Sequence, residues 1–84
     1  MKNKVLVKLI VPDIDEEFDI FIPINKRIGN IIILIIKSIL ELKQVNYNLN
    51  PASSLYNRET GERYSEQSLV RETNIRNGTN LILM

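Results

Sequence analysis

Residues 27–44 read RIGNIIILIIKSILELKQ, and the conformation of this stretch decides the fold. Taken alone, the run from Ile31 to Ile36 is compatible with a buried strand, because β-branched residues pack well in sheets. The length of the stretch, its lysines and the spacing of its apolar residues at three and four positions favour a helix instead. We therefore predict one helix of several turns from Arg27 to about Gln44, with Asn25 as its N-cap.

Two strand patterns precede this helix. From Lys4 to Val11 one face is apolar, and the other face carries Lys4, Leu6, Lys8 and Ile10, which is the period-2 pattern of a half-buried strand. After the acidic connection 13–17, Phe18, Ile20, Ile22 and Ile24 share a face against Asp19, Phe21 and Pro23. The two segments predict a hairpin, and Pro23 indicates that its second strand lies at a sheet edge or ends there.

Short elements follow the helix. Residues 47–53 are typical of a loop, and strands are expected at about 54–57, 62–64 and 79–84. The second and third of these strands follow the turn 59–61 and the Asn77-Gly78 turn, since glycine tolerates a positive φ. Between these strands, a helical turn at 67–73 is expected to point Leu69 into the core.

Composition describes one globular domain with little room for a deep pocket. The 84 residues are 44% hydrophobic and 25% charged, with a net charge of +1 and both signs interspersed. We therefore expect no nucleic-acid partner. With no cysteine and no histidine, an enzyme would have only carboxylates for acid–base chemistry, so we expect no catalytic site and no cofactor. No secretory signal precedes the first strand, which predicts a cytoplasmic protein without direct membrane insertion.

The acidic segment 13–17 is the one sequence that suggests a cation site. A calcium-binding EF-hand loop that began at Asp13 would require glycine at its sixth position and glutamate at its twelfth, where this chain has Phe18 and Ile24. The segment is therefore interpreted as a solvated hairpin turn, and no metal site is expected.

The order of the expected elements resembles the β-grasp, and the C-terminal third resembles ubiquitin. The residues that carry this resemblance are Ser54-Leu55-Tyr56, Glu59-Thr60-Gly61-Glu62, Ser68-Leu69, Asn74-Ile75, Leu81 and Leu83. Residues 75–83, IRNGTNLIL, are similar to the Ile-x-Asn-Gly-Asp-x-Leu-x-Leu ending of the YukD and EsaB family, with Thr79 where an aspartate is common. These small ubiquitin-like proteins are encoded with bacterial type VII (WXG100, ESX) secretion systems.

This resemblance implies an α+β fold over residues 1–84, a ubiquitin-like β-grasp with a mixed four- to five-stranded sheet packed on one long helix. It also implies a non-catalytic accessory or regulatory component of type VII secretion in a Gram-positive bacterium, recruited to the membrane through a partner. The sequence ends on Leu83-Met84 rather than on the Gly-Gly tail that ubiquitin conjugation uses, so conjugation is not expected. The alternative is a ubiquitin-like modifier or sulfur carrier that acts through its C-terminus.

The predicted helix offers one candidate protein-binding surface. With residues placed roughly 100° apart, a core-facing stripe within roughly 60° of Ile35 contains Ile28, Ile31, Ile32, Ile39 and Leu42. A second stripe, on a face that a single sheet cannot cover, contains Ile33, Ile36 and Leu40. This stripe is either an interaction surface, an incidental apolar face, or a surface covered by the loop at 47–51.

The open face of the sheet offers the other candidate. If Leu81 and Leu83 point inward, the outward residues of the sheet include Leu6, Tyr56, Ile82 and Met84, with Lys4 and Lys8 around them. By position, this set resembles the sheet face with which ubiquitin binds most of its partners. The alternative is a two-layer domain with a few apolar residues left on its open face. Either surface would suit a protein partner, which the resemblance implies is a type VII secretion component, or a second copy in a homodimer.

Overall fold

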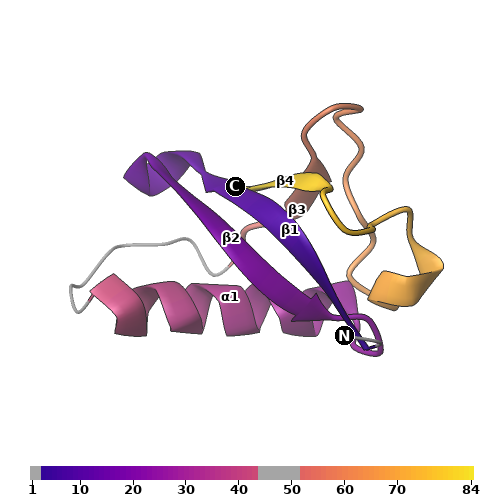
Figure 1. Ribbon diagram of the computed structural model, residues 1–84. Coiled ribbons are helices and arrows are strands. Elements are labelled where there is room, and N and C mark those ends of the chain that lie inside the picture. The colour runs from indigo at the N-terminus through magenta and orange to yellow at the C-terminus, as the bar shows by residue number, and fades with distance from the viewer. Residues whose placement is uncertain (1–2, 44–51) are drawn as a thin grey trace.

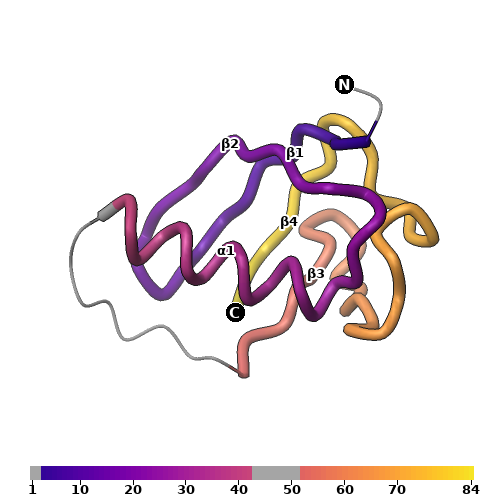
Figure 2. Tube along the Cα trace, turned by 90° about the horizontal axis from the view of Figure 1, so that it is seen from below, coloured from indigo at the N-terminus to yellow at the C-terminus, as the bar shows by residue number. Residues whose placement is uncertain are grey.

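The computed structural model describes residues 3–43 and 52–84, and in it one helix lies across one face of a mixed sheet (Figures 1 and 2). The predicted hairpin, long helix, third strand and last strand are confirmed. Residues 47–51 of the predicted loop lie outside the described residues. In chain order the elements are β1 (Lys4–Val11), the 3-10 helix η1 (Pro12–Ile14), β2 (Glu16–Pro23), α1 (Ile28–Lys43), β3 (Leu55–Asn57), the 3-10 helix η2 (Val70–Glu72) and β4 (Asn80–Leu83).

The sheet has the order β2-β1-β4-β3. β1 pairs antiparallel with β2 and parallel with β4, while β3 pairs antiparallel with β4. β2 is therefore an edge strand, as Pro23 indicated. The turn before β4 depends on Gly78, whose φ of 88° lies in the left-handed region that glycine adopts without strain. Asn77 fixes this turn to β1, since its Oδ1 accepts a hydrogen bond from the Leu6 N–H at 2.8 Å.

The prediction of a strand at 62–64 is wrong, and the described residues form a sheet of four strands. Arg63 forms only an isolated bridge with Tyr56. The bridge is held by two main-chain hydrogen bonds to β3, from the Asn57 N–H to the Glu62 carbonyl at 2.8 Å and from the Tyr64 N–H to the Leu55 carbonyl at 2.9 Å, and the pairing ends there. After this bridge the chain turns toward the start of α1, where the Glu66 and Ser68 carbonyls accept hydrogen bonds from the N–H groups of Gly29 and Ile28.

The same contact explains why the predicted N-cap is wrong. Asn25 is separated from the first helical residue by Lys26 and Arg27. A helix begins with N–H groups that have no partner within the helix. Here the loop before η2 supplies acceptors for two of them, at 2.9 Å for Ile28 and 3.0 Å for Gly29. The helix start is thus determined by tertiary contacts, which a local sequence signal does not contain.

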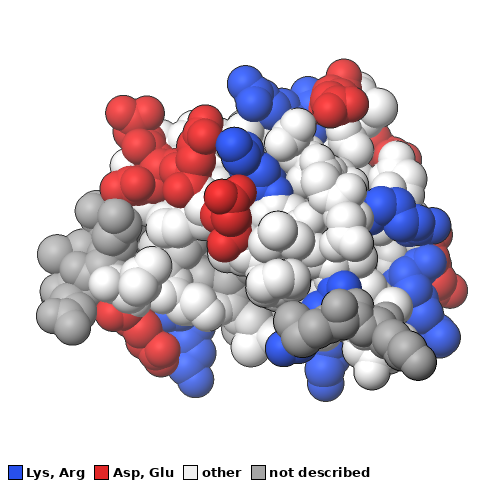
Figure 3. All heavy atoms as spheres, in the orientation of Figure 1, with Lys and Arg blue, Asp and Glu red and all other residues white. Residues whose placement is uncertain are grey.

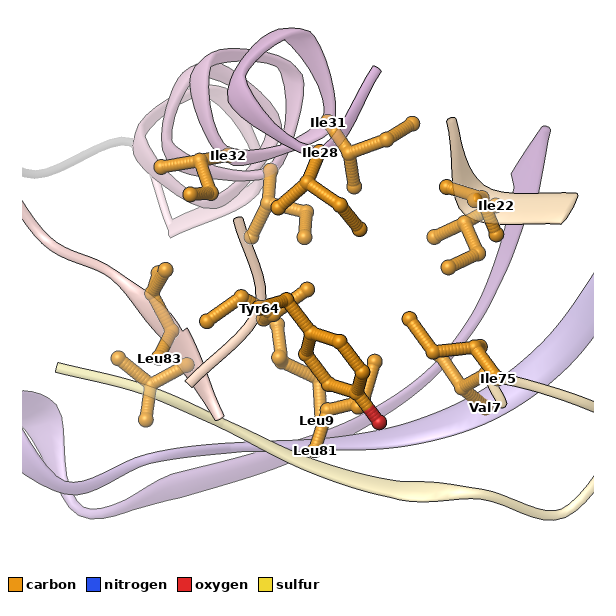
Figure 4. Close-up of a cluster of buried hydrophobic side chains, with 14 of the residues drawn as sticks. Val7, Leu9, Ile22, Ile28, Ile31, Ile32, Tyr64, Ile75, Leu81 and Leu83 are labelled. Carbon is orange, nitrogen blue, oxygen red and sulfur yellow. The ribbon is translucent and has the colours of Figure 1, made fainter. Parts of the chain in front are cut away.

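The core fills the layer between α1 and the sheet (Figure 4). Its buried apolar residues come from every strand, from α1 and from the segments around η2: Val7, Leu9, Val11, Ile22, Ile28, Ile31, Ile32, Ile35, Ile39, Leu55, Tyr64, Val70, Ile75, Leu81 and Leu83. The predicted helix stripe is therefore confirmed at its first five positions. It is wrong at Leu42, which is 69% exposed, because α1 and the hairpin diverge toward the C-terminal end of the helix (Figure 1).

The helical turn near residue 70 forms, but its inward residue differs from the prediction. Val70 is fully buried, whereas Leu69 is only half-buried. Main-chain hydrogen bonds set the orientation of this turn. The Val70 N–H donates to the Lys26 carbonyl at 2.9 Å, and the Arg71 N–H donates to the Ile24 carbonyl at the same distance. These bonds join the segment to the linker between β2 and α1, and they turn Val70 rather than Leu69 into the core.

Candidate protein interface

Four apolar side chains gather on the face of the sheet opposite α1. The strand register places Tyr56 of β3 directly opposite Ile82 of β4, and Ile82 opposite Ile10 of β1. Met84 follows two residues after Ile82 and is 53% exposed. We call Ile10, Tyr56, Ile82 and Met84 the open-face patch. Three of the predicted residues thus lie together, and Ile10 joins them from the neighbouring strand.

Leu6, the fourth residue predicted for this face, lies apart from the open-face patch. It is opposite Phe21 of β2 rather than opposite Ile82. Lys8 stands between Leu6 and Ile10 along β1, opposite Asp19 on one side and Asn80 on the other. Four residues of strand correspond to about 13 Å, so Leu6 and Phe21 form a separate apolar pair.

Sequence alternation already placed Ile10 and Phe21 on the outward faces of their strands. What alternation does not contain is the offset between strands that are distant in the sequence. Only the pairing of β1 with β4 shows that Ile10, rather than Leu6, lies next to Ile82. The sequence therefore shows that Ile10 and Phe21 point outward, but it does not show which residues lie beside them.

The predicted second stripe of α1 is only partly exposed. Ile33 is 64% exposed, but Ile36 and Leu40 are half-buried and pack against the core. The expectation that a single sheet leaves all three uncovered is therefore wrong for two of them. The loop at 47–51, proposed as an alternative cover, lies outside the described residues. Leu34, on the other flank of the helix, and Leu42, at its C-terminal end, are exposed, and neither was predicted to be so.

A buried polar network holds the segment between β3 and β4. The Asn57 amide donates to the Tyr64 hydroxyl at 3.0 Å, and this hydroxyl donates to Asn74 Oδ1 at 2.6 Å. Burial raises the pKa of Tyr64 above its usual value of 10.0, because desolvation disfavours the phenolate; the Asn57 hydrogen bond opposes this shift, and Glu62 adds to it. The network ties two loops to the edge of the sheet and has the character of a structural element.

A Tyr64→Phe substitution should lower the free energy of unfolding by about 1 to 3 kcal/mol at neutral pH, since it removes the partner of the buried Asn57 amide. The folded state also holds the phenol proton more tightly than the unfolded state. The parent domain should therefore keep this contribution below pH about 10 and lose it as the pH rises further, while the variant should lose less. Urea titrations at pH about 7 and about 10.5 would measure both effects. An equal decline in the two proteins would contradict the assigned cause.

The described residues contain no group of three or more histidine, cysteine, aspartate or glutamate side chains arranged to hold a metal ion. No helix in the described ranges has the length and apolar character needed to cross a membrane.

The mixed sheet, its strand order and the single helix across one face define a ubiquitin-like β-grasp domain, which confirms the fold that the sequence predicts. No protein-family model matches the chain, and no curated protein does. Solved structures similar to this chain do exist.

The ubiquitin-like domain of EccD5 from Mycobacterium xenopi has a TM-score of 0.76 at 16% identity, with 96% of this chain and 92% of that chain covered. The ubiquitin-like domain of the Mycobacterium tuberculosis type VII secretion system protein EccD1 has a TM-score of 0.71 at 9% identity, with 95% and 96% covered. A ubiquitin-like domain of an Arabidopsis thaliana protein has a TM-score of 0.72 at 13% identity, with 98% and 77% covered. At these identities the likeness shows the fold.

Proposed function

We propose that this domain is a non-catalytic protein-interaction module of a type VII secretion system and belongs to the YukD and EsaB subfamily of ubiquitin-like proteins. It acts by binding a component of the secretion machine through the open-face patch. The alternative occupant of this patch is a second copy of the chain.

The observation that carries the proposal is the composition of the open-face patch. Ile10, Tyr56 and Ile82 lie side by side on three adjacent strands, and Met84 extends the patch along β4. Polar residues border the patch, since Glu17 of β2 is opposite Ile10 and Lys8 lies two residues before Ile10 on β1. An apolar centre with a polar rim is the usual anatomy of a protein interface.

The assignment to secretion is supported by two further observations. The ending at 75–83 is similar to that of the YukD and EsaB family. Two of the similar structures are ubiquitin-like domains of EccD5 and of EccD1, and EccD1 is described as a type VII secretion system protein. A cytoplasmic domain that reaches the membrane by binding such a partner, in a Gram-positive bacterium, is consistent with both.

An Ile82→Lys substitution should abolish capture of a secretion component while the domain stays folded. The new side chain can extend its amine into solvent, so little stability is lost. Burying the native isoleucine at a partner contributes about 1.5 to 3 kcal/mol, and its loss would weaken binding by roughly ten- to a hundredfold. Affinity capture from the source organism followed by identification of type VII components measures the effect.

Ile33→Lys is the matched control, because Ile33 is exposed on α1, away from the open face of the sheet. This variant should capture the partner normally. Retained capture by a folded Ile82→Lys protein would show that the open-face patch is not the interface. Sedimentation of the purified domain tests the alternative, since a homodimer that the Ile82→Lys substitution dissociates would make a second copy the occupant.

A further inference from the structure

The edge of β2 is open within the described part of the chain. In β1, main-chain groups of Leu6 and Lys8 bond toward the β4 side, to Gly78 and Thr79. Because main-chain groups alternate in direction along a strand, those of Val5, Val7 and Leu9 bond to β2. Their partners in β2 are Phe18, Ile20 and Ile22. The N–H and C=O groups of Glu17, Asp19 and Phe21 therefore point away from the sheet, where an added strand could pair with them.

An apolar groove runs along this edge, between β2 and α1. Its volume is about 420 Å³, and the side chains that line it include Phe18, Ile20 and Ile22 from β2 and Leu34, Ser38 and Leu42 from α1. Leu34 is 47% exposed and Phe21, at the same edge, is 54% exposed. A strand that paired with β2 would turn alternate side chains into this groove. The edge thus offers main-chain hydrogen bonds and apolar contacts to the same ligand.

The charge at this edge is acidic. Every ionisable side chain from Pro12 to Pro23 is a carboxylate, and these residues gather at the upper left in Figure 3 beside an uncharged area. Lys8 is opposite Asp19 and offsets part of this charge, whereas Glu17 is opposite the apolar Ile10. On α1, Lys37 and Glu41 lie three and seven residues after Leu34, so one cation and one carboxylate share its side of the helix and the acidic excess comes from the hairpin.

These charges disfavour a second copy as the ligand. Two β2 edges that paired antiparallel in the register that uses Glu17, Asp19 and Phe21 of both copies would place Asp19 opposite Asp19, and like charges directly opposite each other destabilise a sheet. A segment with lysines or arginines on either side of an apolar run would instead complement the carboxylates.

We infer that the β2 edge and the adjoining groove bind an extended, basic-flanked apolar segment of a partner protein, which adds to the sheet as a fifth strand beside β2. This inference deepens the proposed function and rests on it, because both treat the domain as a protein-binding module. The surface is distinct from the open-face patch, so one contact can occur without the other.

The test is a set of synthetic peptides in which two lysines on each side flank six residues that alternate valine or isoleucine with serine or threonine. Members of this set should bind the purified domain in a fluorescence anisotropy titration. Bound peptide should slow hydrogen exchange at the amides of Glu17, Asp19 and Phe21. The same cores with glutamate flanks should bind at least about tenfold more weakly, and raising the salt concentration should reduce this difference.

Leu34→Ser and Ile33→Ser form a matched pair of variants. Both residues are exposed on α1, but only Leu34 lines the groove. Leu34→Ser should weaken peptide binding about tenfold, and Ile33→Ser should leave it unchanged. If no lysine-flanked peptide binds, or if bound peptide protects other amides, the inference is wrong. Protection of the β2 amides by self-association without peptide would also overturn it. Capture through Ile82 does not depend on any of these results.

Discussion

An Ile35→Asp substitution is expected to unfold the domain at neutral pH. Ile35 is only 5% exposed and belongs to the core stripe of α1. An aspartate there would be forced to stay protonated, which costs about 4 kcal/mol at pH 7 for a group whose ordinary pKa is near 3.9. The lost apolar contacts cost about 2 to 5 kcal/mol more. A domain of this size has a total stability of roughly 4 to 13 kcal/mol, so most or all of it would be lost.

The dependence on pH distinguishes this cause from a general disturbance of the helix. The introduced carboxyl has a higher pKa in the folded state than in the unfolded state, so its penalty is absent below pH about 4 and grows as the pH rises. The variant should therefore regain structure on acidification, as circular dichroism at 222 nm (the helix signal) would show. A variant that melts like the parent domain at pH 7 would contradict the placement of Ile35.

Ile33→Asp is the control for this experiment. It makes the same change two positions away in the same helix, at a side chain that is 64% exposed. The helix propensity lost is equal, but the carboxylate stays in water, so the free energy of unfolding should change by less than about 1 kcal/mol. The difference between the two variants then measures burial alone.

The parts of the fold that follow from periodicity could be predicted from the sequence. The period of α1 identifies five of its core residues, and alternation assigns the inward faces of β1 and β2. The expectations that failed depend on contacts between distant segments. Leu42 has the phase of a core residue but lies where helix and hairpin diverge, and residues 62–64 have a strand pattern but pair with β3 only through one bridge.

In the candidate interface, too, some features follow from local periodicity and others depend on contacts between distant segments. The outward direction of Tyr56, Ile82 and Met84 follows from the alternation of the last strands, and the structure places them side by side. That Ile10 rather than Leu6 lies beside Ile82 depends on the register of the parallel pair β1 and β4, and no local turn sets this register. The groove beside β2 was not predictable at all, because it requires the distance between α1 and an edge strand.

A comparison of Leu9→Ala with Ile10→Ala should separate the core face of β1 from its binding face. Leu9 is fully buried at the centre of the sheet, between Phe18 of β2 and Leu81 of β4. Its truncation should lower the free energy of unfolding by about 2 to 5 kcal/mol, the sum of lost transfer free energy and the cavity left behind. Urea titrations of the two variants would measure the difference.

Ile10 is the next residue in the chain, but it is half-buried on the face of the sheet opposite α1. Its truncation should cost less than about 1.5 kcal/mol of stability, because the surrounding water fills the space. If the open-face patch is the interface, Ile10→Ala should nevertheless weaken capture of the partner, while Leu9→Ala should bind normally at temperatures where it is folded. Equal losses of stability would mean that β1 is covered on both faces, and the open-face patch would then not be available to a partner.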